Sequence, residues 1–380
     1  GRELRVWNKV IGQPLGKPAV VYNLDHPVIP DGVKKSVPFA APSQTSTRNQ
    51  PVRVLAEDAS IFGGLAFNGP VIYYGTSTGR FKAYDTASGK TLWDRDLEAS
   101  VYSTPVYADG VVAVGSIRNA ILGLSARDGE TIWRVPTSAP VIGDGRVVDG
   151  DLYIGGGRKT FYKLAMKTGT IIWQNDGNFG TFQGRPAVAD GKVIFGAWDG
   201  HLYCLDAATG KKLWTWDNGR PGQRLLSPAN CAPVITAGKV FIVAPDRYMT
   251  ALDPATGHQI WRTHQYQVRE SLGVSRDGRT IYAKLMDGRV LAVDAAAPEF
   301  QKRWVTPTAS TYDHTPTPLL ENRHVVYAGF RGGLLAACDA ASGRLLWESK
   351  CGNSAFNRIQ TGPDGSVWIT LIDGQIYRIK

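Results

Sequence analysis

Polar side chains able to bind a ligand recur at intervals along this chain. The candidate ligand-binding residues are Tyr102, Gln183, Arg185, Asn230, Arg269, Glu270, Asp313, His314, Asn357 and Arg358, and Phe62 and Asp144 fall in the same series. Arginine binds carboxylate, sulfate or phosphate through two parallel hydrogen bonds, and aromatic faces stack on other rings. If the fold gathers these residues at one mouth, they predict a site for a polar ligand. The alternative is a water-filled mouth without a specific ligand.

Recognised catalytic and metal-binding patterns are not found. The histidines do not occur at HxxxH spacing and the cysteines do not form CxxC, so no metal site is expected. A serine nucleophile elbow and a phosphate-binding loop are likewise missing. The four cysteines leave two alternatives open: disulfides between Cys204 and Cys231 or between Cys338 and Cys351, or four buried thiols.

The candidate residues belong to an internal repeat that reads apolar-x-Asp-Ala-x-Thr/Ser-Gly-x-x-x-Trp. Its tryptophans lie 40 to 47 residues apart, at Trp93, Trp133, Trp173, Trp214, Trp261, Trp304 and Trp347. Four copies preserve both turn residues, as Asp85 with Gly89, Asp206 with Gly210, Asp253 with Gly257, and Asp339 with Gly343. The longest interval contains an insertion around residues 218–224, where a ligand-binding loop could lie.

Each part of the repeat has a mechanical reason. Asp and Thr accept hydrogen bonds from backbone N–H groups in a tight turn, and Gly supplies the positive φ that closes it. The Trp that follows starts a strand and can wedge between neighbouring sheets. Alternating apolar residues upstream of each turn predict three further short strands, so each repeat of about forty residues has the content of one propeller blade.

Residues 350–380 predict only three strands, 356–361, 367–371 and 375–380. Propellers avoid a bare sheet edge, so a strand from the N-terminal region is expected to complete this blade. Residues 1–8 and residues 52–55 are the two candidates. We therefore predict an all-β, eight-bladed propeller, with seven blades plus a tail as the alternative. Residues 1–54 are expected to form an irregular, Pro-rich basic arm and residues 55–380 the propeller.

The formal net charge of +10 is concentrated towards the front of the chain. Such a charge attracts anionic partners but says nothing about fold, and no nucleic-acid-binding module accompanies it, so specific nucleic-acid binding is not expected. No run of 18 apolar residues is present, so no transmembrane helix is predicted.

The repeat resembles the PQQ-like (pyrroloquinoline-quinone-type) β-propeller family over roughly residues 55–380. Residues 205–214, LDAATGKKLW, are a near-consensus copy. The family includes quinoprotein alcohol dehydrogenases and non-enzymatic propellers such as the outer-membrane barrel-assembly lipoprotein. The dehydrogenases have adjacent cysteines and an acidic calcium site that cannot be matched here, so the resemblance is closer to the non-enzymatic members.

We therefore expect a non-catalytic, exported propeller that acts as a binding or scaffolding module, alone or within a larger secreted protein. The resemblance implies a periplasmic or extracellular location in the bacterial envelope. A protein or glycan partner is expected at the channel mouth, with a monomeric propeller and no cofactor. The alternative is an enzyme at the same mouth, including a dehydrogenase using pyrroloquinoline quinone with calcium.

Overall fold

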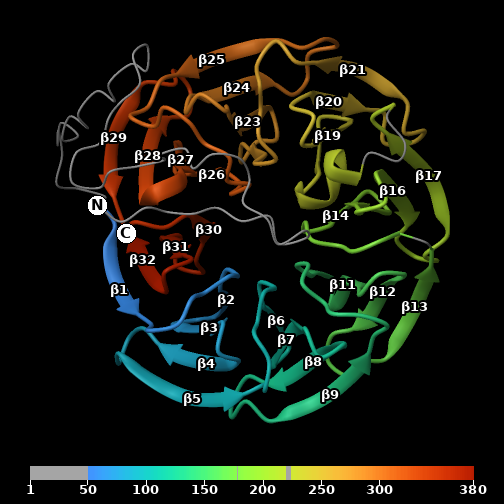
Figure 1. Cartoon of the computed structure of the whole chain (residues 1–380), viewed down its shortest axis with the longest axis vertical. Coiled ribbons are helices and arrows are strands. Elements are labelled where there is room, and N and C mark those ends of the chain that lie inside the picture. Colours follow the sequence, from blue (N-terminus) through green and yellow to red (C-terminus); the bar gives the residue numbers. More distant parts are fainter. Residues whose placement is uncertain (1–49, 178, 220–223) are drawn as a thin grey trace, which may run out of the picture. The chain divides into compact units, whose positions relative to one another are not determined.

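The computed structural model describes residues 50–177, 179–219 and 224–380, and these form eight four-stranded antiparallel sheets around a ring (Figure 1). The predicted eight-bladed, all-β propeller is confirmed, and the alternative of seven blades plus a tail is wrong. Helical structure in the described residues is limited to three 3-10 turns, η1 (Arg224–Leu226), η2 (Pro228–Asn230) and η3 (Arg331–Gly333).

Each blade runs from a short innermost strand to an outermost strand at the rim (Figure 1). From the inside outward, blade 1 consists of β2 (Ala66–Asn68), β3 (Val71–Gly75), β4 (Arg80–Asp85) and β5 (Lys90–Asp96), and blade 2 of β6 (Val106–Ala108), β7 (Val111–Ser116), β8 (Ala120–Ser125) and β9 (Thr131–Pro136). Blade 3 consists of β10 (Arg146–Val148), β11 (Asp151–Gly156), β12 (Thr160–Ala165) and β13 (Ile171–Asp176). Blade 4 consists of β14 (Ala187–Ala189), β15 (Lys192–Gly196), β16 (His201–Asp206) and β17 (Lys212–Asp217).

Blades 5 to 8 repeat this order. They consist of β18 (Val234–Thr236), β19 (Lys239–Val243), β20 (Met249–Leu252) and β21 (Gln259–Thr263); β22 (Gly273–Val274), β23 (Thr280–Lys284), β24 (Val290–Asp294) and β25 (Lys302–Thr306); β26 (Leu320–Asn322), β27 (Val325–Gly329), β28 (Leu334–Asp339) and β29 (Leu345–Lys350); β30 (Phe356–Thr361), β31 (Val367–Leu371), β32 (Gln375–Ile379) and β1 (Val52–Ala56).

The repeat's Asp organises the turn between the two outer strands of a blade. In blade 4, Asp206 Oδ1 accepts hydrogen bonds from Thr209 N (2.7 Å) and Thr209 Oγ1 (2.8 Å). The Thr209 side chain, with the backbone N–H groups, lowers the pKa of Asp206. Gly210 follows with φ of +70° and donates its N–H to Asp206 O at 2.8 Å. Asp253 with Thr256 repeats this geometry in blade 5.

The repeat's Trp joins one blade to the next. Its indole N–H donates to a backbone carbonyl in the outer turn of the following blade at 3.0–3.1 Å, in the pairs Trp93–Ala126, Trp133–Met166, Trp173–Ala207, Trp214–Pro254 and Trp304–Ala340. The turn glycine lies directly under the ring: a Cβ on Gly210 would be 2.6 Å from Trp173 Cδ2. Gly is therefore required for its backbone conformation and for contact with the neighbouring blade.

Trp261 departs from this pattern. The next turn, in blade 6, is the degenerate copy, and Lys239 Nζ donates to its carbonyls, Ala295 O at 3.0 Å and Ala296 O at 3.2 Å. The Trp261 Nε1 is buried without a hydrogen-bond partner. Its ring instead meets Phe300 edge-on, with 5.7 Å between ring centroids.

Strand β1 closes the ring by pairing antiparallel with β32. The candidate at residues 52–55 is therefore confirmed, whereas residues 1–8 lie outside the described residues. The pairs Arg53–Tyr377 and Leu55–Ile376 flank a bulge like the one beside Trp93 in blade 1, so Leu55 takes the place of the Trp. Most of the predicted arm, residues 1–54, lies outside the described residues and stays a prediction.

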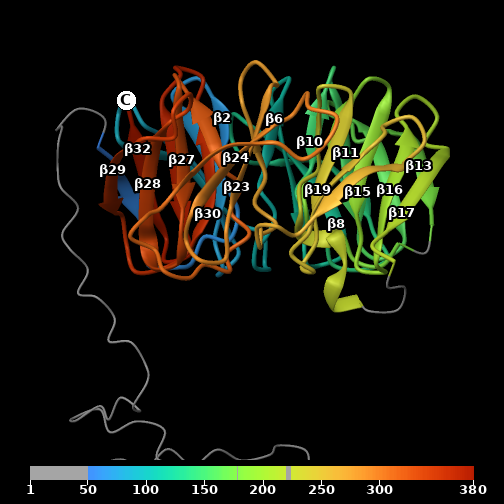
Figure 2. The ribbon, with the colours of Figure 1, turned by 90° about the horizontal axis from the view of Figure 1, so that it is seen from above.

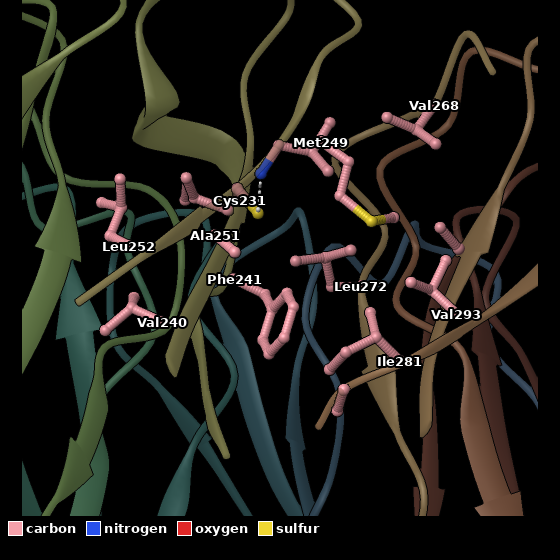
Figure 3. Close-up of a cluster of buried hydrophobic side chains, with 14 of the residues drawn as sticks. Cys231, Val240, Phe241, Met249, Ala251, Leu252, Val268, Leu272, Ile281 and Val293 are labelled. Carbon is pink, nitrogen blue, oxygen red and sulfur yellow. Dashed lines mark hydrogen bonds between the residues drawn. The ribbon is translucent and has the colours of Figure 1, made fainter. Parts of the chain in front are cut away.

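Apolar side chains fill the space between adjacent blades. Figure 3 shows the contact between blades 5 and 6, where Phe241 and Met249 face Leu272 and Ile281. Cys231 lies in this cluster and accepts a hydrogen bond from Val243 N at 3.5 Å. All four cysteines are free and buried, and burial raises the pKa of each thiol to about 12. The structure thus has the four buried thiols and neither disulfide.

Replacing Trp173 and Trp261 separately by Phe should destabilise the protein unequally. Trp173→Phe removes the indole hydrogen bond to the Ala207 carbonyl and leaves that carbonyl only the longer bond from Tyr153 Oη at 3.5 Å, so we expect a loss of about 1–2 kcal/mol of unfolding free energy beyond the smaller ring. Trp261→Phe removes an N–H that has no partner and should cost less. Chemical denaturation of both variants measures the difference, and equal losses would contradict the role assigned to the Trp173–Ala207 bond.

Two substitutions in the closing strand β1 should differ in their effect on stability. Leu55→Asp places a charge in the half-buried seam between blades 8 and 1 and should cost about 2 kcal/mol or more. Val52→Asp, in the same strand but 67% exposed, should stay within about 0.5 kcal/mol of the original protein. Urea midpoints compare the two, and a harmless Leu55→Asp would show that β1 is dispensable for closure.

Candidate functional site

The connections from each outermost strand to the next innermost strand all emerge on one face of the ring, here called the mouth face. They surround a cavity of about 450 Å³. Of the ten candidate residues, Tyr102, Gln183, Arg185, Asn230, His314, Asn357 and Arg358 line it, together with Phe62 and Asp144. The repeat places these residues there because each lies just before, or at the start of, an innermost strand.

An ion pair crosses this mouth. The Arg358 guanidinium of blade 8 contacts the Asp144 carboxylate at the entrance to blade 3, and Asp144 Oδ1 also accepts the Thr104 N–H at 2.6 Å. Burial lowers the pKa of Arg358 to about 10, so the group stays charged at neutral pH. Within the described residues, Asp144 is the only acidic side chain lining the cavity, and its charge is already matched.

Other mouth residues make hydrogen bonds and a ring stack within the protein. Asn357 Nδ2 donates to Ile61 O, and Gln183 Oε1 accepts the Trp198 indole N–H at 3.2 Å. Phe62 and Tyr102 stack with 4.7 Å between ring centroids and an interplanar angle of 6°. The mouth therefore combines an aromatic wall at the entrances to blades 1 and 2 with polar groups from the other blades, including the adjacent blades 3 and 8.

Asp313 does not line the cavity. Its carboxylate is 2.8 Å from Lys284 Nζ, and both side chains are fully buried. Thr315 Oγ1 and the Arg331 N–H donate to the same carboxylate. Lys284 Nζ also donates to Gly329 O at 2.7 Å, so this group joins blades 6 and 7. Sequence reasoning missed Lys284, because an alternating strand gives no sign that its lysine points inward.

Arg269 and Glu270 also lie away from the cavity lining. Arg269 Nη1 is 2.8 Å from Glu270 Oε2, and Arg247 Nη1 is 3.8 Å from the same oxygen. Glu270 is 1% exposed, which explains why it needs cations beside it. Two arginines and a glutamate thus form a buried charged group next to Lys284 and Asp313, rather than a set of open ligand-binding groups.

The insertion predicted around residues 218–224 belongs to the mouth face. It leads into η1 and η2, which project beyond the strands in Figure 2. Leu225 in η1 is 83% exposed, and Tyr312 and Tyr102 on other mouth-face connections are 49% and 41% exposed. Residues 220–223 lie outside the described residues. An exposed apolar side chain thus stands at three of the connections, where a second protein can contact it.

Two further observations concern the described residues only. No group of three or more His, Cys, Asp and Glu side chains is placed to hold a metal ion. No helix among them is long and apolar enough to cross a membrane.

A family model described as outer membrane protein assembly factor BamB matches residues 42–148, 121–230 and 162–380. No curated protein sequence matches the chain. The structure of BamB from Moraxella catarrhalis is 15% identical, with a TM-score of 0.70, covering 87% of this chain and 100% of that one.

Other solved structures share the propeller. The quinohemoprotein alcohol dehydrogenase from Comamonas testosteroni is 16% identical with a TM-score of 0.67, over 87% of this chain and 76% of that one. A computationally designed protein, Ika8, is 19% identical with a TM-score of 0.72, over 87% and 99%. At these identities the likeness shows the fold alone, since one fold hosts many functions.

The ion pair across the mouth can be tested by a double-mutant cycle. Arg358→Met leaves the Asp144 carboxylate without its cation and should cost about 1–3 kcal/mol of unfolding free energy, as should Asp144→Asn. The double variant should cost clearly less than the sum, because neither charge is then left alone. Arg127→Met, which breaks an exposed pair with Asp128, should change stability by less than about 0.5 kcal/mol. Additive losses would contradict a coupled pair.

Proposed function

The chain belongs to the family described as outer membrane protein assembly factor BamB, and on that premise we propose that it is a non-catalytic propeller that binds a protein partner during outer membrane protein assembly. The observation that carries the proposal is the set of exposed apolar side chains on the mouth face, Leu225, Tyr312 and Tyr102. A rigid ring presents them at fixed positions, which reduces the entropy lost when a partner docks. The proposed location is the periplasm of the bacterial envelope.

The same mouth argues against the dehydrogenase alternative. Pyrroloquinoline quinone with calcium would need a carboxylate free to ligate the ion, but Asp144 is paired with Arg358. Glu270 is likewise paired with Arg269, and Asp313 with Lys284. The residues present do not fit that cofactor, so the proposal includes neither a quinone nor a catalytic residue. The proposal also includes a monomeric propeller and a polar or glycan ligand at the mouth. It includes no specific binding of nucleic acid.

The test compares changes at Leu225 and Tyr312 on the mouth-face connections with a change at Leu213 on the outer strand β17. Leu225→Asp, combined with Tyr312→Ala, should disrupt docking, because truncating a central apolar contact typically costs about 2 kcal/mol, roughly a thirtyfold loss of affinity. In the host bacterium lacking the natural gene, this variant should leave outer-membrane proteins depleted in the membrane fraction. The matched control is Leu213→Asp, which is 48% exposed on β17 and should restore them.

Variant levels are followed by immunoblotting, so that loss of function is separated from loss of protein. Normal outer-membrane protein levels in the gene deletion itself would refute an assembly role. Full complementation by the Leu225→Asp, Tyr312→Ala variant would refute the docking surface. Turnover of an alcohol by the purified protein supplied with quinone and calcium would support the dehydrogenase alternative instead.

A further inference from the structure

Two arginines beside the mouth have no partner among the described residues. Arg146 begins β10 in blade 3, and Arg185 lies in the connection entering β14 in blade 4. The Nε atom of each is shielded from solvent and has no hydrogen-bond acceptor. Asp144, the acid that lines the cavity in the described part of the chain, is already paired with Arg358. Their charges are therefore unmatched within this part of the protein.

The positive charges of the two guanidinium groups also repel one another. Burial lowers the pKa of Arg146, and the charge of Arg185 lowers it further. Burial also lowers the pKa of Arg185. A lysine in this position could lose its proton and become neutral, but arginine stays protonated at any physiological pH. Two partly buried like charges repel one another, and an anion bound between them would relieve that cost.

The surroundings have a surplus of positive charge. Among the described residues, the cavity lining carries the guanidinium groups of Arg185 and Arg358 but a single carboxylate, Asp144, and Arg146 adds a positive charge beside Arg185. Low-dielectric walls concentrate the field of such a group, which raises the local concentration of anions. The charge of the region therefore attracts an anion from solution towards the unpaired arginines.

Access to the pair comes from the cavity. Arg185 lines it, and Gln183 and Asn230 lie on the same side with amide groups that can donate to an oxyanion. A volume of about 450 Å³ is large enough for a metabolite carrying two or three carboxylates or a phosphate. The pair thus has a route to solvent, neutral donors at its entrance and room for the ligand.

We propose that Arg146 and Arg185 form a binding site for a small polycarboxylate or phosphate anion inside the propeller mouth. Arg185 binds the anion from the cavity side, and Arg146 neutralises it from blade 3. The inference concerns the same mouth as the proposed protein docking but needs no protein partner, so either can fail without the other. An anion held here would also screen the repulsion between blades 3 and 4.

The test is a thermal-shift and calorimetric titration of the purified full chain with citrate and, separately, with inorganic phosphate. Sodium chloride at matched ionic strength separates specific binding from general screening. The wild type should show saturable stabilisation by at least one of the two anions beyond the chloride control. The anion that stabilises the protein, citrate or phosphate, identifies the ligand as a polycarboxylate or a phosphate.

Arg185→Gln and Arg146→Gln should each weaken that binding roughly 10- to 100-fold, the effect of losing one charge-assisted hydrogen bond. Without anion, each variant should melt no lower than the wild type, because it removes one of two repelling charges. A merely structural arginine would instead lower the melting temperature. The matched control is Arg134→Gln on the rim strand β9, which should bind as the wild type does. No shift with either anion, or an unchanged affinity in Arg185→Gln, overturns the proposal.

Discussion

The contact between a tryptophan and the outer turn of the next blade is the constraint on which this ring depends. In five of the blade junctions the indole N–H reaches a turn carbonyl, and its ring covers a glycine that no larger residue could replace. The tryptophan thus fills the space between two sheets, supplies a hydrogen bond between them and determines their spacing. Where the turn is degenerate, Lys239 and Phe300 fulfil these roles at Trp261, and where the ring closes Leu55 stands in the tryptophan's place. The junctions differ in detail, but each blade is held by the next.

The middle of the ring is held by charge rather than by apolar packing alone. Lys284 and Asp313 join blades 6 and 7, and Arg358 reaches Asp144 from blade 8 to blade 3. Buried pairs of this kind add little net stability, but breaking one is costly, so they enforce one arrangement of the blades. They also occupy the acids that a metal or a catalytic base would need. The same ion pairs that order the mouth therefore leave it suited to binding, with the arginines of blades 3 and 4 as its unmatched groups.

Relatedness and geometry bear on function in different ways. The propeller is shared by an outer membrane assembly factor and by a quinohemoprotein dehydrogenase, so the ring itself does not choose between scaffold and enzyme. The choice depends on what the mouth-face connections present. Here they present an exposed leucine and two exposed tyrosines, and the acid that lines the cavity is paired; the proposed recognition of a protein partner rests on that combination.

The sequence alone determined the blades, because the turn residues and the tryptophan act locally and recur with every repeat. The strands at residues 356–361 and 367–371 followed from alternation, and the need to cover a sheet edge predicted a closing strand but left residues 1–8 and 52–55 as alternatives. Seven of ten candidate residues proved to line the mouth, since the repeat sets their height in each blade. Tertiary structure alone decided the rest. Asp313 is paired with a lysine 29 positions earlier, and the charge of Arg185 acts on Arg146, 39 positions earlier. Which charges meet depends on how neighbouring blades face each other, and no local pattern records it.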